Sequence, residues 1–237
     1  MGNSGLKQHY ETAKKTGVLK ISDGLGDFPA GFKQLEPHLR VLDLAGNVFT
    51  SIPSEISAFK ALKRLNFNQN VLKSIPDEIG DLSKLECLSL STNKLTRIPP
   101  SIAQLSHLKE VYLSENRIRD FPVVFCKLKQ LVMLDLSKNR ITRIPEEVQD
   151  LQVLELNLNQ NQISEVSESI AKCPRLKTLR LQENCLQLNS IPKAILTESN
   201  ISMIAVEGNL FDMKNFMELE GYDVYMERYT AVKKKMF

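Results

Sequence analysis

The sequence lacks the features that mark secreted, membrane-spanning or metal-binding proteins. It contains only four cysteines in 237 residues, and no two of them form a C-x-x-C pair. Scattered single cysteines fit neither a disulfide framework nor a zinc site, and they favour reduced thiols in the cytosol. No stretch approaches the roughly 18 apolar residues of a membrane helix, and the start has no apolar signal-peptide core. We therefore expect an intracellular chain without a metal or a cofactor.

Catalytic motifs are also absent from the sequence. His9, His38 and His107 are the only histidines, and none belongs to an H-E-x-x-H pattern. Glycine loops that cradle phosphate and the G-x-S-x-G turn of serine hydrolases are missing as well. Catalysis needs an acid, a base or a nucleophile to converge on one place, and the sequence shows no such constellation. This absence argues against an enzyme, and we predict no catalytic residues.

One pattern recurs along most of the chain. Residues 131–145 read L-x-x-L-x-L-x-x-N-x-I-x-x-I-P, and the template returns in both directions from there. Subtracting neighbouring asparagine positions gives steps of 23, 23, 23, 23, 22, 23 and 25 residues for Asn47, Asn70, Asn93, Asn116, Asn139, Asn161, Asn184 and Asn209. This period lies in the roughly 20–29-residue range of leucine-rich repeats. We predict eight such repeats over residues 39–209.

The alternation inside each repeat predicts the fold. In L-x-x-L-x-L the last apolar positions alternate with polar ones, which is the pattern of a short strand with one buried face. Stacked strands would form a parallel sheet, and each Ile-Pro pair would begin an outer turn or short helical piece. The asparagine amide, a donor and an acceptor together, is expected to satisfy backbone groups buried at the turn. The predicted fold is an α/β solenoid, a curved leucine-rich-repeat horseshoe with a parallel concave sheet.

The two ends depart from the repeat and are expected to cap it, because a terminal repeat has no outer neighbour. Residues 18–38 are a degenerate first repeat that serves as an N-terminal cap, and residues 1–17 precede it. Residues 210–237 form a C-terminal helical cap with a basic tail. There, apolar side chains recur at three and four and predict one amphipathic helix: Phe216, Leu219, Tyr222, Tyr225, Met226 and Tyr229. A helix that binds a partner is the alternative.

The opening residues resemble a lipidation signal. Gly2 follows Met1, and Asn3 and Ser4 come next, as in an N-myristoylation sequence, although Leu6 stands where M-G-x-x-x-[ST] has a hydroxyl residue. An ordinary chain start is the alternative. One myristoyl chain binds membranes only marginally, so nearby lysines would have to contact an anionic membrane surface. We expect a lipid-anchored protein on the cytoplasmic face of a membrane, with the cytosol as the alternative.

The strand residues that point away from the core are the candidate binding surface. No basic stripe runs along them, which argues against nucleic acid. The middle of the surface gathers a tyrosine and a methionine ringed by acids, and tyrosine is enriched at interface hot spots. Cys87 lies in this region and is expected to be exposed. The predicted protein-binding residues are Arg64, Glu110, Tyr112, Met133, Asp135, Glu155 and Arg180. A surface that only keeps the sheet soluble is the plainer alternative.

The repeat also points to a family. Over residues 39–209 the form I-P-x-x-I-x-x-L-x-x-L-x-x-L-x-L-x-x-N resembles the intracellular leucine-rich repeats of Ras-pathway scaffolds such as Shoc-two and the Ras suppressor, and of the Scribble and Erbin group. The resemblance implies a non-enzymatic protein–protein interaction module. We expect a monomer that binds an unidentified protein partner, through a basic segment of that partner with an apolar anchor. A soluble regulatory subunit of a signalling enzyme, such as a phosphatase, is the second hypothesis.

Overall fold

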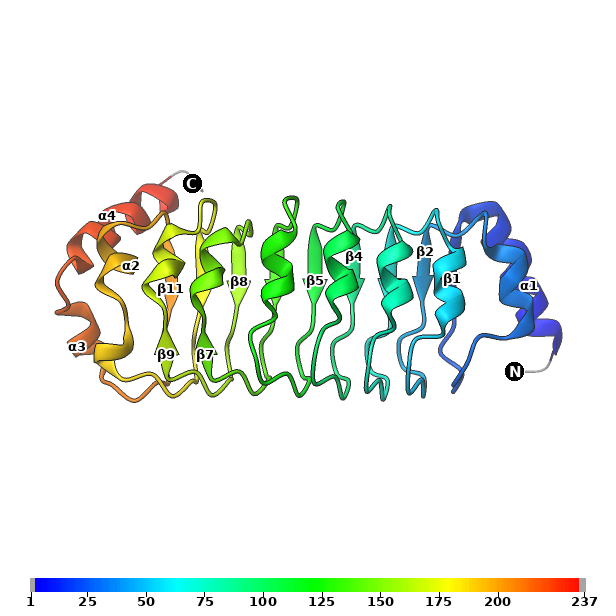
Figure 1. The fold of residues 1–237 in the computed structure, drawn as a ribbon, viewed down its shortest axis with the longest axis horizontal. Coiled ribbons are helices and arrows are strands. Elements are labelled where there is room, and N and C mark those ends of the chain that lie inside the picture. The colour runs from blue at the N-terminus through cyan, green and yellow to red at the C-terminus, as the bar shows by residue number, and fades with distance from the viewer. Residues whose placement is uncertain (1–2, 235–237) are drawn as a thin grey trace. The chain divides into compact units, whose positions relative to one another are not determined.

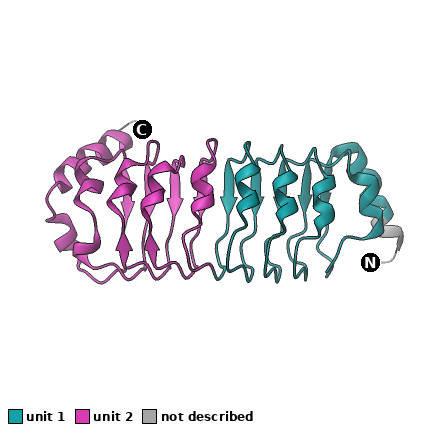
Figure 2. Cartoon of the chain, viewed as in Figure 1, with its two compact units in different colours: residues 1–117 teal, residues 118–237 magenta. Residues whose placement is uncertain are grey.

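The computed structural model describes residues 3–234, with side chains from residue 7 onward. The chain divides into two compact units, residues 1–117 and residues 118–237 (Figure 2). In both units successive repeats coil so that a short strand lies on one side and a 3-10 helix on the other (Figure 1). The predicted lipidation residue, Gly2, and the last lysine of the basic tail, Lys235, lie outside the described residues.

Unit 1 contains a five-stranded stretch of parallel sheet in which each strand pairs with the next one along the chain. Leu19 pairs with Leu42, and Leu65 pairs with Leu88, so the middle residue of each strand keeps the same register. The elements are α1 (Asn3–Thr16), β1 (Val18–Lys20), η1 (Ala30–Leu35), β2 (Val41–Asp43), η2 (Ser54–Ala58), β3 (Arg64–Asn66), η3 (Asp77–Asp81), β4 (Cys87–Ser89), η4 (Pro100–Gln104) and β5 (Glu110–Tyr112).

Unit 2 repeats the same arrangement and adds a second ladder. Its main strands pair in parallel in the order β6, β8, β10 and β11, while β7 pairs with β9 in a two-stranded sheet that the sequence did not predict. The elements are η5 (Val123–Lys127), β6 (Met133–Asp135), β7 (Arg143–Ile144), η6 (Glu146–Asp150), β8 (Glu155–Asn157), β9 (Glu165–Val166), η7 (Glu168–Lys172), β10 (Thr178–Arg180), η8 (Leu188–Ser190), α2 (Lys193–Thr197), β11 (Met203–Ala205), α3 (Met213–Met217) and α4 (Tyr222–Lys233).

The core lies between the strands and the outer 3-10 helices. The predicted inward pairs are buried throughout the regular repeats, as Leu134 and Leu136 illustrate with no exposed surface. Ile56, Ile79 and Ile102, which follow the Ile-Pro pairs, are also fully buried and close the core from the outer side. Burying one such side chain is worth about 1.5–3 kcal/mol. The predicted α/β solenoid with a parallel sheet of leucine-rich repeats is therefore confirmed.

The turn after each strand from β2 onward carries an asparagine with three or more hydrogen bonds, which is buried in every repeat except the last, where Asn209 is half-buried. The Asn116 amide donates to the carbonyl oxygens of Leu90 and Leu113, at 2.9 and 3.1 Å, and its oxygen accepts from the backbone N–H of Leu95 at 3.0 Å. One partner lies in the asparagine's own turn and two lie in the preceding repeat. Asn161, at the end of the 22-residue step, makes the same set of bonds. The structural role predicted for these asparagines is confirmed.

The residue before each ladder asparagine adopts a left-handed backbone conformation. At the first and last repeats this residue is glycine, with φ of 69° at Gly46 and 77° at Gly208. In the repeats between them it carries a side chain, with φ between 53° and 58° at Gln69, Thr92, Glu115, Lys138, Gln160 and Glu183. A non-glycine residue in this region costs about 1–3 kcal/mol, and it persists only where its surroundings hold it. The asparagine bonds on the next residue supply that restraint.

The N-terminal segment forms a helix that the sequence did not predict. Helix α1 includes Tyr10 and Ala13, which are buried, and the Tyr10 ring packs edge-to-face on Phe32 with centroids 6.0 Å apart. A Cβ atom at Gly31 would overlap the Tyr10 ring, so only glycine allows η1 to approach the helix this closely. The sequence gives little sign of this helix, because only two side chains of the described part of α1 are buried and they form no apolar repeat.

The C-terminal region contains two helices instead of the single amphipathic helix that the spacing predicted. Helix α3 ends at Met217 and α4 begins at Tyr222, because Gly221 has φ of 89° and its Cα lies against Thr197, where a Cβ would clash. The Tyr225 hydroxyl accepts a hydrogen bond from the Ile204 N–H of β11 at 3.1 Å. The Arg228 guanidinium donates to the carbonyl oxygens of Ile195, Leu196 and Ile201. Among residues 3–234, no helix has the length and apolar character needed to cross a bilayer.

The asparagine ladder generates a stability prediction. Replacing Asn116 with leucine leaves the Leu95 N–H without its acceptor, and an unsatisfied buried group costs about 1–3 kcal/mol, whereas the Leu90 carbonyl keeps its bond from Asn93. We expect a lower free energy of unfolding in urea. The matched control is Asn189→Leu at an exposed position, which should change stability by less than about 0.5 kcal/mol. Equal urea midpoints for the two variants would contradict a structural role for Asn116.

Candidate functional site

Unit 1 brings three of the predicted binding residues, Arg64, Glu110 and Tyr112, together around Cys87. Arg64 of β3, Cys87 of β4 and Glu110 of β5 occupy equivalent positions on neighbouring strands. The Arg64 guanidinium lies 3.9 Å from the Glu110 carboxylate and 3.7 Å from the Cys87 sulfur. The Tyr112 hydroxyl donates to the same Glu110 carboxylate at 3.5 Å. These side chains form one polar cluster around a central thiol.

The expectation that Cys87 is exposed is wrong. Its side chain is only 5% exposed, because the longer side chains of Arg64 and Glu110 flank it on both neighbouring strands. Burial is the main cause that raises the pKa of the Cys87 thiol above its ordinary value. Burial, followed by the charge of Glu110, also raises the pKa of the Tyr112 phenol. Both groups are therefore neutral near pH 7, and the thiol is not activated as a nucleophile.

Unit 2 carries the other four predicted residues on three neighbouring strands. Met133 of β6 is in register with Glu155 of β8, and Asp135 of β6 is in register with Asn157 of β8, which in turn pairs with Arg180 of β10. The Arg180 guanidinium donates to Glu155 at 2.8 Å. The Asp135 carboxylate accepts from the backbone N–H of Ser137 at 2.9 Å. Met133 and Asp135 are both half-buried.

The acids of the strand surface are not equally available to a partner. Glu110 faces Arg64, Glu155 is paired with Arg180, and Asp43 of β2 lies 3.3 Å from the Lys20 ammonium. Among the described residues, no lysine or arginine pairs with Asp135. Two of the three acids predicted around Tyr112 and Met133, Glu110 and Glu155, are therefore paired with arginines of the same surface. Asp135 is the one predicted acid that forms no ion pair with the described residues.

Unit 2 also has an outer groove that the strand pattern did not predict. It consists of three adjoining hollows on the side of the repeats that carries β7 and η6. The first, of about 490 Å³, is lined by Arg119, Asp120, Arg140, Thr142 and Gln162. The second, of about 260 Å³, is lined by Asp120, Phe121, Val123, Arg143, Pro145 and Glu147. Asp120 borders both hollows, so they meet at its side chain.

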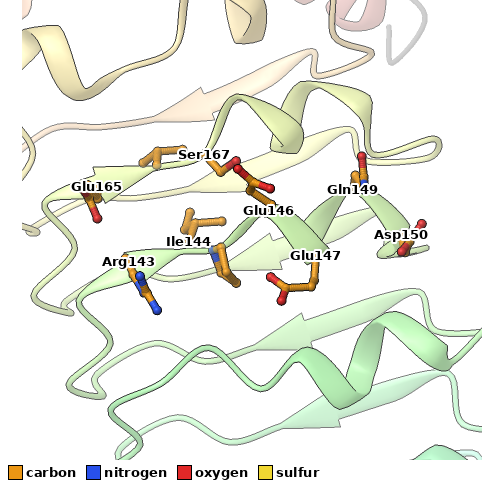
Figure 3. A pocket seen from close by; sticks show the side chains of 10 residues that line it. Arg143, Ile144, Glu146, Glu147, Gln149, Asp150, Glu165 and Ser167 are labelled. Carbon is orange, nitrogen blue, oxygen red and sulfur yellow. The ribbon is translucent and has the colours of Figure 1, made fainter.

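The third hollow of the outer groove is acidic. It measures about 660 Å³ and shares Arg143, Pro145 and Glu147 with the second hollow. Figure 3 shows Glu146, Glu147 and Asp150 along η6, with Arg143 on β7 and Glu165 on β9. A signal for the groove was present in the sequence: the second position after Ile118, Ile141 and Ile163 changes from Asp120 to Arg143 to Glu165 in successive repeats.

The described residues contain no group of three histidine, cysteine, aspartate or glutamate side chains that could hold a metal ion. The acids of the outer groove therefore do not form a metal site as they stand. Polar recognition of another molecule is the chemistry that both surfaces offer.

Known proteins share the fold of this chain. A family model described as leucine rich repeat matches residues 37–95 and 83–141. An internalin from Listeria monocytogenes is similar with a TM-score of 0.72 and 20% identity, over 90% of this chain and 61% of that one. The plant peptide hormone receptor RGFR1, solved in complex with RGF2, gives a TM-score of 0.68 and 27% identity over 83% of this chain and 33% of the receptor.

A further similar structure is the leucine-rich-repeat ectodomain of the receptor kinase GASSHO1/SCHENGEN3 from Arabidopsis thaliana, in complex with CASPARIAN STRIP INTEGRITY FACTOR 2. Its TM-score is 0.66 at 29% identity, over 81% of this chain and 24% of that one. The chain spans less than two thirds of the length of each of these three proteins. The likeness to the internalin concerns the fold alone.

The burial of the cysteines predicts their order of reaction. Cys185 is exposed, whereas burial raises the pKa of Cys126 to about 11 and that of Cys173 to about 12, and Cys87 is shielded by Arg64 and Glu110. At pH 8 we expect Ellman's reagent to modify Cys185 at least about tenfold faster than the other three, because the thiolate is the reacting form. Peptide mapping of the labelled protein measures this, and labelling in denaturant is the control. Rapid labelling of Cys87 would show that its shield of side chains is open.

Proposed function

We propose that this leucine-rich-repeat protein is a non-enzymatic interaction module that binds a protein partner through the outward side chains of its strands. The observation that carries the proposal is the regular placement of these side chains. Parallel pairing in register holds equivalent residues about 4.8 Å apart on neighbouring strands. The buried asparagine ladder keeps the backbone beneath them rigid. A surface ordered before binding loses little conformational entropy when a partner arrives.

In unit 2 the proposed contact is centred on Met133 and Asp135. Both side chains leave β6 on the same side, because they flank the buried Leu134. A lysine or arginine of the partner can pair with Asp135 without breaking an ion pair inside the protein. The flexible thioether of Met133 offers an adaptable apolar contact beside that charge. A basic segment with an apolar anchor fits this combination.

In unit 1 the proposed contact is the Tyr112 ring. Its half-buried phenol is held by the bond to Glu110, and tyrosine supplies a large contact area at a low cost in side-chain entropy. Arg64 and Glu110 surround it as a polar rim. The two plant receptors described above were solved in complexes with RGF2 and with CASPARIAN STRIP INTEGRITY FACTOR 2, and these complexes support a protein ligand for the present chain.

Charge reversal at Asp135 and truncation at Tyr112 test the proposal. Proximity labelling in cells would compare wild type with Asp135→Lys and with Tyr112→Ala, each as a single variant. We expect each variant to lose labelling of its partner, because hot-spot truncations typically cost about 2 kcal/mol or more, or roughly thirtyfold in affinity. The control is Glu168→Lys on η7, which makes the same charge change at an exposed outer position. Equal labelling by all four proteins would refute a partner surface on the strands.

The opening Gly2-Asn3-Ser4 supports a second part of the proposal, that N-myristoylation at Gly2 anchors the protein to the cytoplasmic face of a membrane. One acyl chain binds weakly and reversibly, so Lys14 and Lys15 at the end of α1 are proposed to add attraction to anionic lipid.

Cell fractionation tests the anchor. Gly2→Ala removes the amine that would be acylated, and we expect the variant to move from the membrane fraction to the cytosol. Gly5→Ala preserves Gly2 and is the matched control, so it should fractionate like wild type. Cytosolic wild-type protein would contradict the anchor and favour the second hypothesis, a soluble regulatory subunit.

A further inference from the structure

We infer that the outer groove of unit 2 docks an extended segment of a partner protein that carries an acidic or phosphorylated side chain, then an apolar side chain, then a basic one. The groove is separate from the strand residues of the proposed function. Its lining residues come from the segment between β5 and η5 with the start of η5, from the segment between β6 and η6 with both β7 and η6, and from the segment after β8 with β9. The inference can therefore fail while the proposed function stands, and the reverse also holds.

The first hollow is built to receive an anion. Arg119 and Arg140 both line it, are exposed, and form no ion pair among the described residues. A guanidinium presents a planar fork of donors that matches a carboxylate or a phosphate in two parallel hydrogen bonds. Thr142 and Gln162 line the same hollow and add neutral donors. Asp120 is the one acid of this hollow, and it lies at the boundary with the second hollow.

A backbone donor in the first hollow is also free to bind a segment. The Ser164 N–H donates to the Thr142 carbonyl at 3.0 Å, which continues the outer ladder between successive repeats. The equivalent N–H of Thr142 has no backbone acceptor within the described residues. A carbonyl oxygen of an extended chain can accept that bond, as in recognition by strand addition. This favours a peptide over a free small anion.

The second hollow exists because the chain departs from the repeat at Pro122. This proline has ψ of 84°, whereas the equivalent Pro99 and Pro145 have ψ of 148° and 173°. Within unit 2, the described outer pairing starts at β7, which pairs onward with β9. Val123 is 42% exposed beside Pro145, so the hollow offers apolar atoms to a side chain.

The third hollow complements the first with the opposite charge. Glu146 and Glu147 of η6 and Glu165 of β9 make no ion pair among the described residues, and Arg143 lines the hollow with them (Figure 3). The acids are proposed to bind the basic side chain of the segment whose acidic side chain contacts the two arginines at the other end of the groove. A segment with charges of both signs is then bound in one orientation, because the reversed segment would place like charges together.

The distance between the two ends limits the length of the segment. Arg140 and Glu147 are seven residues apart, and an extended chain spans at most about 3.3–3.6 Å per residue. The partner's acidic and basic side chains are thus separated by at most about seven extended residues. This spacing and charge order define the peptide to be tested.

Synthetic peptides test the inference directly. We would measure fluorescence anisotropy of eight-residue peptides with two glutamates, a central leucine and valine, and two lysines, in both chain directions, against the full-length protein. Parallel arms replace the glutamates with phosphoserine, or make both ends acidic or both basic. We expect one direction of the mixed peptide to bind at least tenfold more tightly than the other peptides. The phosphoserine arm shows which anion the arginines prefer.

Charge reversal at either end supplies the matched variants. Arg119→Glu with Arg140→Glu, and separately Glu146→Lys with Glu147→Lys, should each weaken the preferred peptide at least tenfold. The fourfold variant should prefer the opposite direction. Lys94→Glu with Arg97→Glu, at exposed positions of unit 1, controls for general charge effects. All these side chains are exposed, and circular dichroism melting curves check that each variant folds. If one of the two groove variants does not fold, the other still tests the inference.

Three results would overturn the inference. One is the absence of binding by the mixed peptides at millimolar concentration. Another is an equal loss of binding in the unit 1 control. The third is binding of phosphatidylserine vesicles that depends on Arg119 and Arg140 but not on Glu146 and Glu147, which would assign the arginines to a membrane surface.

Discussion

The buried asparagine amide is the interaction on which the rest of this protein depends. The chain must turn sharply after each strand, inside a stack where water cannot reach the backbone. At Asn93 the amide donates to carbonyl oxygens of its own turn and of the preceding repeat, and its oxygen accepts from the Leu72 N–H. The same atoms thus close one turn and join it to its neighbour. The restraint also holds the preceding residue in a left-handed conformation, so that side chains such as Thr92 occupy a place that otherwise favours glycine.

The two surfaces differ in how their charges are compensated. On the strands, arginine and glutamate from neighbouring repeats pair with each other, as Arg180 does with Glu155, whereas no cation among the described residues pairs with Asp135. In the outer groove the charges are sorted by position: Arg119 and Arg140 lie at one end, and Glu146 and Glu147 at the other. Exposed pairs add little to stability, so the pairing on the strands mainly decides which charges an incoming molecule meets. On both proposed surfaces, the charges that the fold leaves uncompensated are the ones that a partner would meet.

The sequence predicted the elements whose cause lies within one repeat. The burial of Leu134 and the bonding of Asn116 follow from local periodicity and from the chemistry of an amide. Features that depend on two distant segments were missed. The burial of Cys87 depends on Arg64 and Glu110, each 23 residues away along the chain, and the break before α4 depends on Gly221 meeting Thr197. The outer groove depends on a backbone angle at Pro122, which residue identity does not reveal. The predicted binding residues were placed on the correct strands, but their ion pairs could not be anticipated.

One repeat is a residue shorter than its neighbours, and the place of the shortfall is informative. Asn161 follows Asn139 by 22 residues, yet its side chain still reaches the Leu136 carbonyl at 3.0 Å, and β8 still pairs in register with β6 and β10. The missing residue falls between η6 and β8, where Leu151-Gln152-Val153 replaces the longer Leu128-Lys129-Gln130-Leu131. A shorter repeat is thus accommodated on the limb that returns to the strand, while the arc from strand to asparagine keeps its length. Because β8 stays in register with β6 and β10, the outward strand residues keep the same spacing across the shorter coil.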